Sequence, residues 1–128
     1  MAAEDSILNT VKKMLGFDAD YTAFDTDIQI HINSVFFSLT ELGVGPEQGF
    51  FITGDTETWA QFIGDEKIQA VKSYMYLRVR LLFDPPANSF AISSFKEQAE
   101  KLEWMLNVQQ EGARWTRQQL INSSSTTV

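Results

Sequence analysis

His31 is the only histidine of the chain and the residue best suited to acid–base chemistry. Ser34 follows three residues later, so the two side chains would meet on one face of a helix, as a base meets a nucleophilic hydroxyl in a hydrolase. Such a pair also needs an orienting carboxylate and an oxyanion hole, which a single helical turn does not supply. We therefore favour a structural or interface role for His31, and a hydrolase is the remote alternative.

A second group of polar side chains has the spacing of a calcium-binding loop. Ala23 stands where that loop needs glycine, and Gln29 stands where it needs a bidentate glutamate. The absence of cysteine and the single histidine rule out thiolate and two-histidine metal sites. The sequence therefore predicts no metal, no cofactor and no enzymatic activity, and it assigns the four polar residues to helix capping and turns: Asp18, Asp20, Thr22 and Asp25.

Basic side chains gather in the second half of the chain. Residues 1–64 carry ten acidic and two basic side chains, whereas residues 65–128 carry seven acidic and eight basic ones. The net charge of −7 is opposite to that of a typical DNA-binding protein. Four cations between residues 66 and 83 are best explained by a solvated helix face with local ion pairs, with DNA contact as the alternative: Lys67, Lys72, Arg78 and Arg80.

The C-terminal segment 113–128 combines basic, aromatic and Ser/Thr-rich sequence. Trp115 lies between Arg114 and Arg117 in a stretch without core periodicity. Tryptophan and arginine are the residues most often found as interface anchors. Two interpretations stay open: Trp115 anchors a partner, or it folds back onto the body of the protein.

The chain of 128 residues fits one domain, and its apolar periodicity predicts an all-α fold. We expect a small bundle of about four main helices over residues 1–112, followed by a flexible, extended C-terminal tail over residues 113–128. No apolar run is long enough to cross a membrane. The expected helices cover residues 7–15, 25–43, 66–83 and a fourth stretch from Ser89 or Ser93 to Gly112, with a Ser94-x-x-Glu97 capping box and a short helical turn at Trp59.

The helix over residues 25–43 is the expected centre of this bundle. Asp25 or Thr26 would cap its first turn, and Gly43 would close its last. Ile30 and Phe37 lie off its main apolar stripe, so they require a second packing partner, either the first helix or a neighbouring subunit. The stripe itself consists of Ile28, Ile32, Val35, Leu39 and Leu42.

The segment after this helix, residues 44–55, is rich in glycine and too broken for a helix. Phe50, Phe51 and Ile52 within it are β-prone, but so short a strand is not stable alone. These side chains need a cover, and we favour a neighbouring subunit over the protein's own core. The predicted subunit interface therefore comprises Ile30, Phe37, Phe50, Phe51 and Ile52.

Four segments in this order resemble the head–tail connector (adaptor, head-completion) proteins of long-tailed bacteriophages. The resemblance covers about residues 6–110 and is to a scaffold, because none of the segments is a catalytic signature. The segments are the capped helix 6–15, Asp25-Thr26-Asp27-Ile28-x-Ile30-His31-Ile32-Asn33-Ser34 leading to Gly43-Val44-Gly45, Thr58-Trp59-x-x-Phe62, and residues 71–86 ending in Leu82-Phe83-Asp84-Pro85-Pro86.

The resemblance implies a structural subunit of the virion, assembled in the host bacterium. Such subunits form a ring beneath the portal protein, extend the DNA channel without binding DNA specifically, and dock the stopper or tail-completion protein. The C-terminal segment would reach the portal protein through Arg114, Trp115, Arg117, Leu120 and Ile121. A small helical protein that contacts DNA or regulates its packaging is the alternative.

Overall fold

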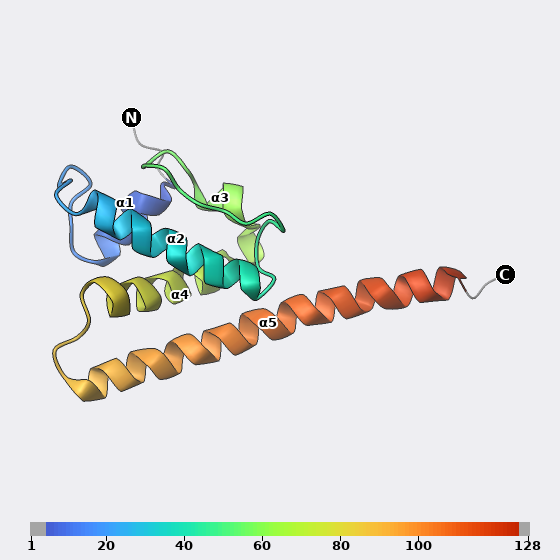
Figure 1. Ribbon diagram of the computed structural model, residues 1–128. Coiled ribbons are helices and arrows are strands. Elements are labelled where there is room, and N and C mark those ends of the chain that lie inside the picture. The colour runs from blue at the N-terminus through green and yellow to red at the C-terminus, as the bar shows by residue number, and fades with distance from the viewer. Residues whose placement is uncertain (1–4, 126–128) are drawn as a thin grey trace.

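The computed structural model is built from helices (Figure 1). It describes the backbone of residues 5–125 and the side chains of residues 5–64 and 66–108. No strand forms within these residues, so the β-prone segment around Phe51 is irregular, and an isolated bridge joins Ser6 to Thr58. The all-α prediction with four main helices is confirmed. The elements are α1 (Ile7–Met14), α2 (Asp25–Glu41), the single turn α3 (Trp59–Phe62), α4 (Asp65–Phe83) and α5 (Ser89–Ser125).

Helix α2 packs against α4 and α1 through its predicted stripe. Ile28, Ile32, Val35 and Leu39 are buried, whereas Leu42 is partly buried just beyond the helix. Gly43 adopts a left-handed conformation with φ of 82°, as predicted for the residue that closes the helix. The buried stripe therefore places α2 at the centre of the fold.

The start of α2 differs from the prediction. Phe24 occupies the N-cap position, and no side chain there accepts a hydrogen bond from the first turn. Asp25 instead lies 2.9 Å from the Nζ atom of Lys12, which is only 1% exposed and also donates to the carbonyl of Ala19 at 2.8 Å. This buried lysine ties α1, the connector after it and α2 together.

Helix α1 is fixed at its own N-terminus and by α3. Ser6 Oγ accepts from the backbone of Asn9 at 3.2 Å, which confirms the predicted cap. The buried Trp59 of α3 donates through its indole nitrogen to Thr10 Oγ1 at 3.2 Å. The tryptophan turn singled out in the sequence therefore anchors the N-terminal helix.

Helix α5 packs on α4 and runs past the other helices toward the C-terminus (Figure 1). Asn88 caps it, since its Oδ1 accepts from the backbone of Ala91 at 2.7 Å. The predicted end at Gly112 is wrong, because the helix continues to Ser125. The predicted capping box of Ser94 and Glu97 is also wrong, since both residues lie inside the helix.

Candidate interaction surface

The loop between α2 and α3 is held by one side chain of α2. Asn33 donates through Nδ2 to the carbonyl of Ile52 at 3.0 Å and accepts from the backbone N–H of Ile52 at 2.7 Å. Ile52 is 1% exposed and belongs to the core, whereas the preceding residue, Phe51, is 67% exposed. The double hydrogen bond therefore turns Ile52 inward and presents Phe51 on the surface.

Two further contacts shape this loop. Gly45 has φ of 88°, and a Cβ atom at this position would lie 2.4 Å from the ring of Phe62, so only glycine fits. Glu57 Oε2 accepts from the backbone N–H and the hydroxyl of Thr53 at 2.9 and 2.8 Å. Partial burial raises the pKa of Glu57, but the hydrogen bonds from Thr53 outweigh it and the pKa is lowered. These contacts fix the conformation of the loop, although it forms neither a helix nor a strand.

The predicted interface residues fall into three groups. Ile30 and Phe37 on α2 are 59% and 68% exposed and, like Phe51, are available to another molecule. Phe50 is partly buried and packs edge-on against Phe36, with ring centroids 5.1 Å apart. Ile52 lies inside the subunit, so we remove it from the candidate surface.

Helix α5 carries exposed apolar side chains that the sequence interpretation missed. Phe90, Trp104 and Val108 are exposed on it, while Ala99 and Leu106 are buried. At about 100° per residue, the three exposed residues fall on one side of the helix. Their spacing in the sequence was the signal that could have identified them. The predicted portal-binding residues 114, 115, 117, 120 and 121 also belong to α5, but their side chains lie outside the described ones.

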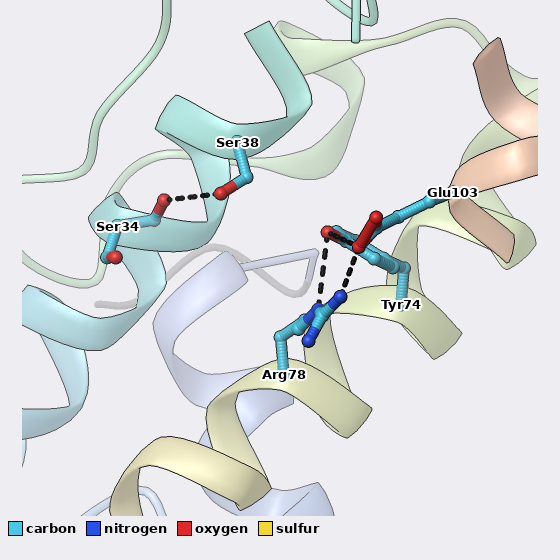
Figure 2. A network of polar contacts seen from close by, with 5 residues as sticks. All are labelled: Ser34, Ser38, Tyr74, Arg78 and Glu103. Atoms are coloured by element: carbon cyan, nitrogen blue, oxygen red, sulfur yellow. Dashed lines mark hydrogen bonds and ion pairs between the residues drawn. The ribbon is translucent and has the colours of Figure 1, made fainter. Parts of the chain in front are cut away.

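A partly buried polar cluster joins α4 to α5 (Figure 2). The hydroxyl of Tyr74 donates to Glu103 Oε2 at 3.0 Å, Arg78 donates to the same carboxylate oxygen, and Arg78 Nε lies 3.4 Å from the hydroxyl of Tyr74. Burial raises the pKa of Tyr74. Burial acts to lower the pKa of Arg78, but the hydrogen bonds to Glu103 and Tyr74 outweigh it and the pKa is raised. The cluster stabilises the protonated forms of Tyr74 and Arg78.

The cations considered for DNA binding are largely engaged within the subunit. Arg78 pairs with Glu103. Arg80 donates to Tyr76 at 3.2 Å and lies 3.8 Å from Asp84, and Lys72 Nζ lies 5.7 Å above the ring of Trp59. These partners favour the solvated, locally paired helix face over DNA contact.

His31 lies against an aromatic cluster. Its ring centroid is 6.2 Å from that of Phe83, which also packs on Phe17 and Phe24. Across the described residues, no hydrogen bond joins His31 to Ser34, and the hydroxyl of Ser38 donates to the carbonyl of Ser34 (Figure 2). This packing gives His31 a structural position beside Phe83.

The acidic residues between positions 18 and 25 do not converge. In the part of the chain that the structure describes, no group of three metal-ligating side chains comes together. Asp25 is engaged by Lys12. None of the described helices combines the length and the hydropathy needed to cross a membrane.

Two grooves flank the contact between α4 and α5. The α2 groove, about 560 Å³, is lined by α2, α4 and α5, with Phe37, Tyr74, Arg78 and Glu103 among its residues. The α1 groove, about 650 Å³, is lined by α1, α4 and α5, with Met14, Lys72, Phe95, Lys101 and Met105 among its residues. Both grooves are concave apolar surfaces of the kind that protein partners fill.

Comparison with known proteins supplies the family. No curated protein and no solved structure is similar enough to this chain to match it. The model of one family, described as phage connector protein, matches residues 7–113, from the first residue of α1 into the second half of α5. The match spans the whole bundle and agrees with the all-helical fold. The chain therefore belongs to the phage connector protein family and is a structural component of the virion.

Proposed function

We propose that this protein is an adaptor subunit that forms a ring beneath the portal protein, extends the DNA channel and docks the stopper or tail-completion protein. The observation that carries the proposal is the exposure of three large apolar side chains, Ile30 and Phe37 on α2 and Phe51 in the loop that follows it. Three large apolar side chains, each more than half exposed, need a cover in the assembled particle. A neighbouring subunit of a ring provides such a cover.

The charge of the chain supports a passive channel. The net charge is −7, and the acidic side chains are concentrated in residues 1–64. A surface that binds phosphates tightly would slow the passage of DNA, because each cation that neutralises a phosphate adds affinity. The internal partners of Arg78 and Arg80 leave α4 poorly suited to gripping DNA.

The C-terminal part of α5 is the proposed contact with the portal protein. Its backbone continues the helix that packs on α4, so it extends from a fixed base. The residues proposed to make the contact are Arg114, Trp115, Arg117, Leu120 and Ile121.

Mass measurement in solution tests the ring, first for the protein alone and then with the portal protein. We expect a closed oligomer in at least one of these conditions. A chain that stays monomeric in both would overturn the proposal. Salt-sensitive binding to duplex DNA that depends on Lys67 and Lys72 would support the DNA-contacting alternative instead.

Truncation before Arg114 tests the portal contact. We expect the shortened protein to keep its unfolding midpoint and to lose only the helical circular dichroism of the removed end of α5, while losing binding to the portal protein. Loss of the fold would show that these residues belong to the core.

Replacement of Phe51 by aspartate should block the oligomer with little effect on stability, because Phe51 is exposed in the subunit.

A further inference from the structure

The exposed side of α2 has a regular pattern of side chains. Asp27, Ile30, Ser34, Phe37 and Glu41 recur at three- and four-residue spacing and are all exposed. These five residues, here called the α2 stripe, form one line along the helix. Two apolar side chains lie in the middle, and the charged groups at both ends are acidic.

The α1 groove has the complementary character. Met14, Tyr76, Phe95 and Met105 give it apolar walls, and two of the side chains that line it are lysines, Lys72 and Lys101. Among the described side chains that line it, none is acidic. Asp5 approaches Lys72 from outside, at 3.9 Å, which is near the outer limit for an ion pair. An acidic partner with a small apolar centre would match this groove in both charge and polarity.

The α2 groove, which Phe37 of the stripe lines, and the α1 groove lie on opposite faces of α4. Phe37 of the stripe lines the α2 groove together with Tyr74 and Arg78 of α4. The α1 groove uses Lys72 and Tyr76 of the same helix. At about 100° per residue, Tyr74 and Arg78 are about 40° apart, while Lys72 and Tyr76 each lie about 160° from Tyr74. A copy of the chain could therefore use its stripe and its groove at the same time.

We propose that the α2 stripe of one subunit seats in the α1 groove of the next. Ile30 and Phe37 then contact the apolar walls, and Asp27 and Glu41 face the side that carries Lys72 and Lys101. This inference rests on the proposed ring and names the two surfaces that meet in it. A contact between two different surfaces is heterologous, and such contacts form a ring when the rotation between neighbouring subunits closes after a full turn.

Disulfide trapping tests the contact directly, because the chain contains no cysteine. Two single variants are prepared: Ser34→Cys in the stripe, and Gln98→Cys, carrying a size tag, at the α1 groove. They are mixed, assembled alone or with the portal protein, and oxidised. The proposal predicts a tagged–untagged disulfide dimer in the assembled fraction. Ser93→Cys, also exposed on α5 but outside the groove lining, replaces Gln98→Cys in the control mixture, which should give no such dimer.

The outcomes separate this inference from the proposed function. An oligomer by mass together with the stripe–groove disulfide supports both. An oligomer by mass without this disulfide, or with disulfides mainly between Ser34→Cys copies, overturns the heterologous contact and leaves the ring standing. A monomer under every condition overturns both.

The variant Lys101→Glu provides a second measurement. It should raise the concentration needed for assembly about tenfold or more, because it places an acidic side chain against the acidic residues of the α2 stripe. An unchanged concentration would contradict the proposed charge match.

Discussion

The two sides of α2 carry the same kinds of residues and have different roles. Ile32, on the side that packs against the rest of the bundle, is fully buried, whereas Ile30, only two positions earlier, is exposed. Phe36 lies in the core, and the next residue, Phe37, lies on the surface. Composition alone does not distinguish these neighbours. The subunit's own packing explains the buried side, and assembly is our explanation for the exposed one.

The largest expected effect comes from comparing one aspartate substitution on the buried side of α2 with one on its exposed side. Ile32→Asp buries an unpaired carboxylate and should cost about 4 kcal/mol or more, enough to unfold a marginally stable domain. Ile30→Asp should change the free energy of unfolding by less than about 1 kcal/mol while weakening the oligomer. Chemical denaturation and mass measurement check the pair. Equal destabilisation by both variants would show that the exposed side is also part of the core.

Neighbouring lysines provide a second matched pair. Lys12→Ala removes the buried partner of Asp25 and the contact with the carbonyl of Ala19, so we expect a loss of about 3 kcal/mol in the free energy of unfolding. Lys13→Ala changes an exposed side chain and should stay within about 0.5 kcal/mol of the wild type. Urea titrations of both variants measure the difference. Similar values for the two would mean that the ion pair contributes little.

The loop that presents Phe51 depends on Asn33. Asn33→Ala removes both hydrogen bonds to Ile52 and should cost about 2 kcal/mol. Hydrogen exchange at the amide of Ile52 should accelerate with it. Ser34→Ala, at the next position on the exposed side, serves as the control and should leave both quantities near the wild type. Slow exchange in the Asn33 variant would show that other contacts hold the loop.

The smallest effect is a pH dependence from the cluster between α4 and α5. Because the pKa of Tyr74 is raised in the folded protein, its contribution to stability is complete below about pH 10 and is lost as the pH rises through the folded-state pKa. Tyr74→Phe should lower stability by about 1 kcal/mol at neutral pH and reduce the alkaline loss. The control variant Tyr21→Phe, at an exposed site, should lose stability at alkaline pH to the same extent as the wild type. Unfolding midpoints measured from pH 8 to 11 test this expectation.

The sequence was informative where local chemistry decides the structure. Apolar spacing identified the buried stripe of α2, and Ser6 and Gly43 marked helix ends because each satisfies backbone groups locally. The resemblance to connector proteins was confirmed by the family model. The same spacing places Ile30 and Phe37 outside the buried set, and both are exposed, although what covers them stays a prediction.

Long-range contacts decided the features that the sequence did not reveal. Lys12 resembles Lys13 in the sequence, and only the fold buries it beside Asp25. Ile52 and Phe51 are both β-prone, so the sequence predicts the same interface role for them, but the two hydrogen bonds between Asn33 and Ile52 turn only Ile52 inward. Gly112 has a weak helix propensity, yet α5 passes through it, since a single glycine costs only about 1 kcal/mol in a helix.

The central claim is that the exposed side of α2 is an assembly surface, and one comparison of masses tests it most directly. Phe37→Asp and its control Phe90→Asp, which is exposed on α5 outside both grooves, are each mixed with the portal protein and measured beside the wild type. We predict that the wild type and Phe90→Asp form the oligomer and that Phe37→Asp remains monomeric with an unchanged unfolding midpoint. An oligomer of Phe37→Asp equal to that of the wild type would contradict the claim.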